Sequence, residues 1–249
     1  MDYFVPDIRC AEELGTQTAI QDKFGGLPWG LPNSRWPLCK DCGKPQSLLA
    51  QLGHDRDRMN LGRDGRVLFI FQCAHDPGLC ATWDGHSGAN ACFVCEPEDL
   101  MEGTTSAPRD SNLPDHEVRV VGWERRMDLV SADVVPAFFD ERRMNALPDA
   151  VRESVTFSTR AGGVPQWKQS PAEAPNRSAG WRFAAQLDSS YSFLRAPTVP
   201  VDWVSIDDEG YEGRTHIAQG PNFGDGGLAY VFLRDTGNLP EGFVFWQCG

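Results

Sequence analysis

The chain has 249 residues, with 35 acidic and 23 basic side chains, and its formal net charge is -12 at pH 7. No apolar run approaches the roughly 20 residues of a membrane-spanning helix, and the first ten residues lack the apolar stretch of a secretory signal. This charge argues against nucleic acid as a partner and would suit a basic protein. We therefore expect a cytoplasmic protein without a membrane partner.

The elements predicted in chain order are mostly short strands. Residues 1–22 have the character of a polar lead, with some helix around Ala11–Leu14, and 24–38 is a loop rich in glycine, proline and tryptophan. Apolar, β-branched and aromatic runs predict strands at Ser47–Leu52, Arg66–Cys73, Ala91–Cys95, Glu117–Trp123, Trp181–Leu187, Leu228–Leu233 and Phe243–Trp246. One helix is expected near Pro136–Asn145 and a second near Asp149–Val155, because Pro148 separates them.

Three segments recur in the same order in both halves of the chain. Gly25-Gly26-Leu27-Pro28 matches Gly162-Gly163-Val164-Pro165, and the strand ending at Gln51-Leu52 matches the one ending at Gln186-Leu187. The runs that begin at Asp64-Gly65 and Asp225-Gly226 match after an insertion around Ser192–Gly220. Such order favours a duplication. We expect an α+β, β-rich single domain over 1–249, built from pseudo-symmetric halves at 24–130 and 155–249 with few short helices.

Six of the eight cysteines fall between residues 39 and 95. Without a secretory signal, clustered cysteines indicate metal ligands before disulfides. Cys39 and Cys42 form a Cys-x-x-Cys followed by glycine, which suits a zinc knuckle, and Pro77-Gly78 can reverse the chain between Cys73 and Cys80. These four cysteines predict a closed, structural zinc site.

Other ligand sets stay open at this point. Cys92 and Cys95 form a second Cys-x-x-Cys, and His75 or His86 could replace one ligand. Ala91–Cys95 has the character of a strand, however, in which residues three apart point to opposite faces. The remaining alternative is that the cysteines bind no metal and are buried in the reduced form as small apolar side chains.

We find no phosphate-binding loop, dinucleotide fingerprint or nucleophile elbow in the sequence. His75-Asp76 and Asp84-Gly85-His86 could support acid–base chemistry, but between cysteines of a metal loop they favour a structural role, and His54, His116 and His216 stand alone. Most of the eight tryptophans should anchor short strands in the core. Trp29 and Trp36 are candidates to line an aromatic groove that holds a basic peptide.

The chain resembles a known domain in two places. The stretch from Cys39-x-x-Cys42-Gly-Lys-Pro through Leu48–Leu52 to Arg66–Cys73 resembles the core of programmed cell death protein 2 and its yeast ribosome-biogenesis relative. The opening Gly-Gly-Leu-Pro and the late run Asn222–Leu233 resemble the bacterial YwqG-like family of unknown function. The resemblance implies a duplicated β-rich domain. It also implies metal binding by Cys39, Cys42, Cys73 and Cys80, and, in the eukaryotic relatives, a chaperone role for a small-subunit ribosomal protein.

Together these observations predict a non-catalytic, protein-binding or chaperone-like module stabilised by structural zinc. A toxin-immunity protein is the second hypothesis, because an acidic surface would suit a basic toxin. A hydrolase or redox enzyme that uses the Cys/His loop at 73–95 is the third. No small-molecule cofactor is expected.

Overall fold

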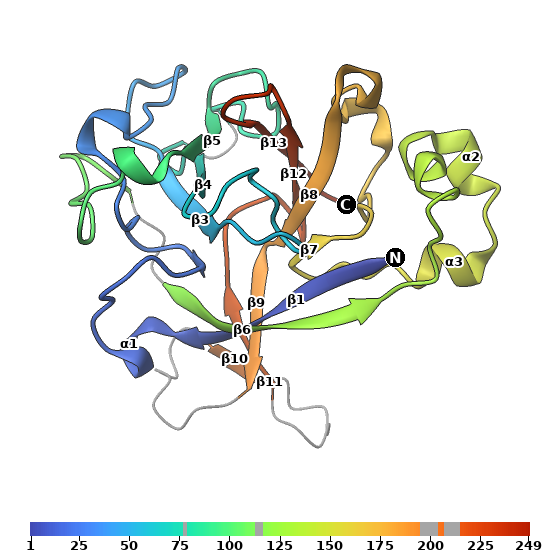
Figure 1. Cartoon of the computed structure of the whole chain (residues 1–249), viewed down its shortest axis with the longest axis horizontal. Helices are drawn as coiled ribbons and strands as arrows, with labels where there is room; N and C mark the ends of the chain where they lie inside the picture. The colour runs from blue at the N-terminus through green and yellow to red at the C-terminus, as the bar shows by residue number, and fades with distance from the viewer. Residues whose placement is uncertain (77–78, 113–116, 195–203, 207–214) are drawn as a thin grey trace.

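The computed structural model describes residues 1–76, 79–112, 117–194, 204–206 and 215–249. Within them the chain folds around a closed antiparallel β-barrel, with a smaller sheet below it and the short helices of residues 141–153 at one side (Figure 1). In order around the barrel, the strands are β1 (Asp2–Cys10), β6 (Val118–Met127), β2 (Lys23–Phe24), β3 (Ser47–Gly53), β4 (Val67–Gln72), β5 (Asn90–Cys95), β13 (Glu241–Gln247), β12 (Leu228–Arg234), β8 (Trp181–Asp188) and β7 (Arg160–Gly162). The strand-rich fold and the strands expected from apolar runs are confirmed.

Residues 2–10 form a strand, so the expectation of a polar lead was wrong for this segment. β1 pairs along its whole length with β6 and closes the barrel against β7. Its side chains alternate only in part: Tyr3, Ile8 and Cys10 are buried, Asp7 is exposed, and the other residues are partly buried. The expected helix at Ala11–Leu14 is present as α1.

The central strands β4 and β12 are buried on both faces, which explains their unbroken apolar sequences. Leu68 and Ile70 face the barrel interior, where they pack in one cluster with Val231 and Leu233 from β12. The opposite faces are covered by loops. Trp36 lies over Phe71 of β4, with their ring centroids 5.6 Å apart.

The expected helix near Pro136–Asn145 is broken in two. A 3₁₀ turn, η3 (Val135–Phe139), is followed by α2 (Glu141–Asn145), and Asp140 between them has extended backbone with φ -140°. The Asp140 carboxylate instead caps α2 by accepting from the Arg143 backbone N–H at 2.9 Å. α3 (Asp149–Glu153) is the second expected helix. Among the described residues, no helix combines the length and the apolar character that crossing a membrane requires.

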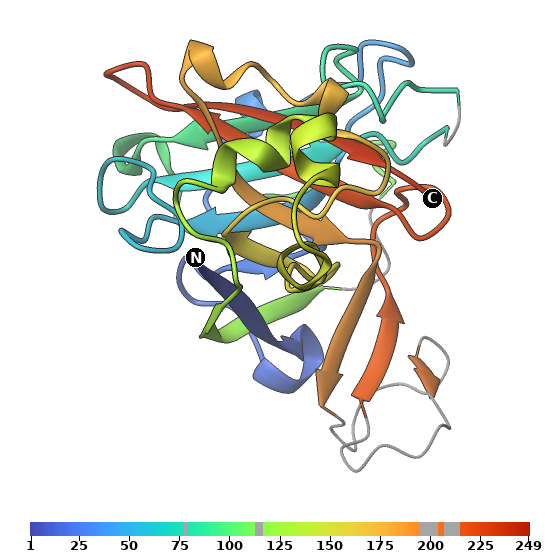
Figure 2. The same cartoon turned by 90° about the vertical axis from the view of Figure 1, so that its right-hand side faces the viewer.

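A separate three-stranded sheet lies beside the barrel (Figure 2). Its strands are β9 (Ser190–Leu194), β10 (Val204–Ile206) and β11 (Thr215–Gln219), in the order β10-β11-β9. The described part of the insertion expected around Ser192–Gly220 therefore forms this sheet.

Two glutamines make matching contacts on opposite sides of the barrel. Gln51 on β3 accepts from the Trp29 backbone N–H at 2.7 Å and donates to the Gln21 carbonyl at 3.1 Å. Gln186 on β8 accepts from the Gln166 N–H at 3.1 Å and donates to the Thr156 carbonyl at 3.0 Å and the Ser158 carbonyl at 2.8 Å. Both side chains are fully buried, so each glutamine fixes the loop that crosses its barrel end.

The glycine pairs before those loops share an unusual backbone. Gly25 and Gly26 have φ values of 68° and 65°, and Gly162 and Gly163 have 76° and 71°. Two successive residues with positive φ favour glycine strongly. A bulge follows in each adjacent strand, at Leu49 in β3 and at Ala184 in β8.

Candidate metal centre

The first arm of the cysteine cluster is a tight hairpin before β3. Leu38 and Pro45 form a β-bridge, the Cys39 N–H donates to the Lys44 carbonyl at 2.8 Å, and the Gly43 N–H donates to the Cys39 carbonyl at 2.8 Å. Gly43 has φ 72°, which lets the chain turn directly after Cys42. The hairpin thereby holds the side chains of Cys39 and Cys42 on one side.

The second arm follows β4. Cys73 comes directly after the last residue of that strand, and its N–H donates to the Ala89 carbonyl at 2.8 Å. The Cys80 N–H donates to the Asp76 carbonyl at 3.0 Å, which bends the loop back toward Cys73. The rigid end of a buried strand thus positions one cysteine, and a local turn positions the other.

The two arms are also bonded to each other. The Asp41 carboxylate accepts from the Ala81 N–H at 2.8 Å, and the Lys40 N–H donates to the Gly88 carbonyl at 3.1 Å. The Lys40 side chain of the hairpin also packs directly against Gly88. A Cβ atom at position 88 would lie only 2.3 Å from the Lys40 Cδ, so this close approach requires glycine. These contacts set the separation of the arms independently of the sulfur atoms.

The four sulfur atoms of Cys39, Cys42, Cys73 and Cys80 all lie within 4.8 Å of one another and could hold a metal ion. The Cys42 and Cys73 Sγ atoms are 3.6 Å apart. Cys39, Cys73 and Cys80 are buried, whereas Cys42 is partly exposed. The structure therefore brings together the four cysteines that the sequence singled out.

The thiol pKa values reflect this crowding. Burial raises the pKa of Cys73 to about 11 and also raises that of Cys80. Burial acts to raise the pKa of Cys42 as well, but hydrogen bonds from the Lys44 N–H and the neighbouring thiols bring it below its ordinary value. Ionising all four thiols requires a cation among them, because their negative charges would otherwise repel at close range.

The alternative ligands lie outside the cluster, among the residues that the structure describes. Cys92 packs against the barrel interior, and Cys95 belongs to the apolar cluster on the outer face, as expected for residues three apart in a strand. The His86 ring instead packs against that of Phe243, with the ring centroids 4.9 Å apart and the ring planes tilted by 52°. His75 lies between Cys73 and Cys80 in the sequence but is not a member of the four-residue group.

Trp29 and Trp36 occupy core positions. They are 9% and 6% exposed, and the Trp36 indole N–H donates to the Gln46 carbonyl at 2.9 Å. Their rings are therefore not available to line an open groove, and the structure does not place them where a partner-binding role requires.

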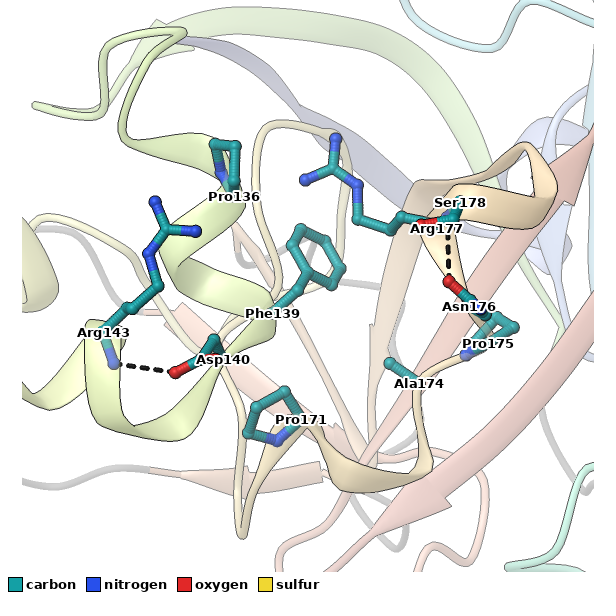
Figure 3. A pocket seen from close by; sticks show the side chains of 10 residues that line it. All are labelled: Pro136, Phe139, Asp140, Arg143, Pro171, Ala174, Pro175, Asn176, Arg177 and Ser178. Atoms are coloured by element: carbon teal, nitrogen blue, oxygen red, sulfur yellow. Dashed lines mark hydrogen bonds between the residues drawn. The ribbon is translucent and has the colours of Figure 1, made fainter.

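An open pocket of about 550 Å³ lies away from the cysteine loops, between the η3–α2 segment and residues 171–178 (Figure 3). Its walls carry two arginines, Arg143 and Arg177, with the Phe139 ring between them. No sequence pattern predicts this pocket, because its two walls come from segments about 30 residues apart and neither segment carries a recognisable motif.

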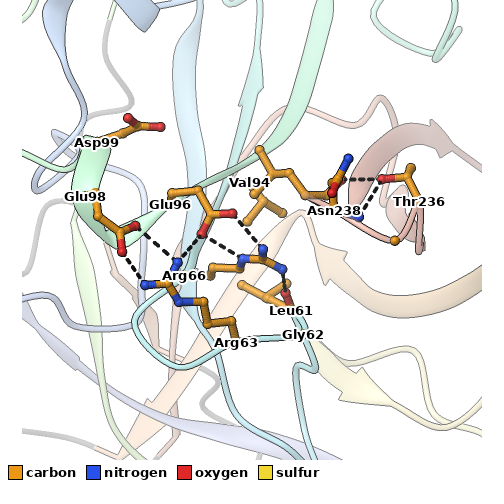
Figure 4. Close-up of polar contacts among 12 residues, drawn as sticks. Leu61, Gly62, Arg63, Arg66, Val94, Glu96, Glu98, Asp99, Thr236 and Asn238 are labelled. Carbon is orange, nitrogen blue, oxygen red and sulfur yellow. Dashed lines mark hydrogen bonds and ion pairs between the residues drawn. The ribbon is translucent and has the colours of Figure 1, made fainter.

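A cluster of charged groups on the β4–β5 side is an ion-pair network (Figure 4). Arg66 donates to both carboxylate oxygens of Glu96, at 3.0 and 2.6 Å, and Arg63 pairs with Glu96 and Glu98. Hydrogen bonding from Arg66 lowers the pKa of Glu96, and Arg63 does the same for Glu98. Both carboxylates are held ionised, which suits a structural role better than proton transfer.

Comparison of the chain with family models, curated proteins and solved structures finds no match.

Proposed function

We propose that the four cysteines bind one Zn²⁺ as a closed structural site. With Zn–S bonds of about 2.3 Å, a tetrahedral site separates its sulfur atoms by about 3.8 Å. The Cys42 and Cys73 sulfur atoms are 3.6 Å apart, and no two of the four sulfur atoms are more than 4.8 Å apart, so small movements of the side chains would produce this spacing. Four thiolates complete the coordination that zinc prefers, so no position is left for a substrate or an activated water. This closed donor set supports a non-catalytic role.

The metal would join the hairpin at 38–45 to the loop that follows β4. Within the described residues, neither segment has a helix or a long strand to order it. Zinc would thus hold the two segments together at this end of the barrel. The hydrogen bonds of the Asp41 carboxylate and the Lys40 N–H already orient the segments for metal binding.

We infer that this ordered surface binds another protein. The metal-bearing loops expose three large apolar side chains, Leu38 (58% exposed), Leu79 (77%) and Trp83 (42%). Two of them directly neighbour cysteines of the cluster, so a bound metal would hold them in place. Rigid, exposed apolar groups on an otherwise charged surface are typical of protein interfaces.

The test compares three forms of the protein as bait in extract of its source cells. The double variant Leu38→Asp/Leu79→Asp removes the apolar groups, and Met127→Asp, at a 76% exposed position on β6, is the matched control. We expect wild type and the control to retain a protein that the double variant loses, while zinc content is equal in all three. Retention of the same proteins by all three baits, or of none, would contradict the proposal.

The identity of the retained protein distinguishes the two binding roles. A ribosomal protein supports the chaperone-like function. A basic toxin supports the immunity function, for which the net charge of -12 provides electrostatic complementarity.

We further propose that the two halves of the barrel are copies of one ancestral unit. The paired glycines, the strand bulges and the contacts of Gln51 and Gln186 support this, because they recur at the same places in both halves. The extra sheet of β9–β11 would be an insertion into the second copy, and the metal loops an elaboration of the first.

A further inference from the structure

The pocket in Figure 3 has a donor-rich lining in an acidic protein. Arg143 on α2 and Arg177 on the 3₁₀ turn η5 (Arg177–Ala179) stand on its two sides. Among the described residues, neither guanidinium has an ion-pair or hydrogen-bond partner, whereas nine other arginines pair with carboxylates: Arg35, Arg58, Arg63, Arg66, Arg119, Arg125, Arg126, Arg152 and Arg234.

The pocket also contains the groups that would orient a ligand. The Arg177 guanidinium lies over the Phe139 ring, 4.5 Å from its centroid, which restrains that long side chain. Asn176 uses its carbonyl oxygen to accept from the Ser178 N–H at 2.9 Å, which leaves its amide N–H groups for another acceptor. Asp140 is the acidic residue of the lining, and one of its oxygens is engaged by the Arg143 N–H at 2.9 Å.

The geometry points to a binding site for a small molecule that carries a phosphate or carboxylate group. Two guanidiniums and one carboxylate give the lining a net positive charge, opposite in sign to that of the whole chain. Guanidinium groups bind phosphate and carboxylate with two parallel hydrogen bonds each. The pocket volume of about 550 Å³ is within the range of small-molecule sites. This site is independent of the cysteine cluster and of the proposed protein partner.

The test is a titration of ¹⁵N-labelled protein with inorganic pyrophosphate and, separately, with citrate, each against sodium chloride at equal ionic strength. We expect saturable shifts of the backbone amides of Asn176, Arg177 and Arg143. Arg143→Ala and Arg177→Ala should each weaken binding about tenfold or more, because each removes a charge-assisted contact. Arg142→Ala is the matched control: it removes a neighbouring exposed arginine that does not line the pocket, and it should change binding less than about twofold.

The two probes separate the ligand classes. Binding of pyrophosphate alone identifies a phosphate ligand, binding of citrate alone a carboxylate, and binding of both the shared anionic chemistry. The proposal is overturned if chloride produces the same shifts, if the shifts do not saturate, or if Arg142→Ala weakens binding as much as the pocket variants. All three arginines are exposed, so the variants should melt at the wild-type temperature.

Discussion

Replacing the buried glutamines tests how the barrel ends are held. Gln51→Ala removes the acceptor of the Trp29 N–H and the donor to the Gln21 carbonyl. Each buried group left without a partner costs about 1–3 kcal/mol, so the free energy of unfolding should fall by about 2–6 kcal/mol. Gln186→Ala breaks the matching contacts to Gln166, Thr156 and Ser158. Thr156 is exposed, so water can replace its contact, and the two remaining groups give a similar cost.

The assay is thermal and urea denaturation of both variants beside wild type. For a chain of this size, each kcal/mol lowers Tm by about 2–4 °C, so both variants should melt about 5–20 °C lower. Gln169→Ala is the control, because that exposed side chain makes a single hydrogen bond to the Cys248 carbonyl, and Tm should change by less than about 2 °C. A Gln51 variant with wild-type stability, or a large difference between the two glutamine variants, would refute the reasoning.

Three further predictions follow from the same structure. Cys80→Ser should abolish metal binding, as measured by elemental analysis. It should also lower the free energy of unfolding by about 3 kcal/mol or more, since structural zinc can contribute about 10 kcal/mol. The control Cys92→Ser lies outside the cluster and should keep its metal. Because the pKa of Glu96 is lowered by Arg66, its stabilising effect is present above the ordinary glutamate pKa of about 4.3 and is lost as the pH falls toward the lowered value; Glu96→Gln should therefore flatten the loss of Tm on acidification below about pH 4. Gly163→Ala should destabilise by about 1–2 kcal/mol in urea denaturation, because φ is 71° and the new Cβ would lie 3.1 Å from the Tyr3 Cβ, whereas Gly122→Ala, with open space and no positive φ, should change stability by less than about 0.5 kcal/mol.

The sequence predicted strands best where both faces of the strand are buried. β4 and β12 are apolar at nearly every position because the barrel interior covers one face and loops cover the other, so their strands were evident. β1 was missed because a register shift between Asp7 and Ile8 breaks its alternation and because it contains Pro6, features that also fit an irregular segment. Its role depends on pairing with β6, more than 100 residues away, which no local pattern reveals.

The candidate sites also differ in how far they could be predicted from the sequence. The cysteines could be identified because metal ligands have a characteristic residue type and spacing, and because Gly43 follows the first pair while Pro77-Gly78 lies between the members of the second. The roles expected for Trp29 and Trp36 depended on exposure, and composition does not distinguish a tryptophan that anchors a core from one that lines a groove. The arginine-lined pocket depends on tertiary packing of two irregular segments and was not predictable from either.

The metal content of protein purified without added metal tests most directly whether the cysteine cluster is a structural zinc site. One zinc per chain in wild type, and none in Cys39→Ser, is the predicted result. Wild-type protein without metal, with the same Tm as Cys39→Ser, would contradict the account.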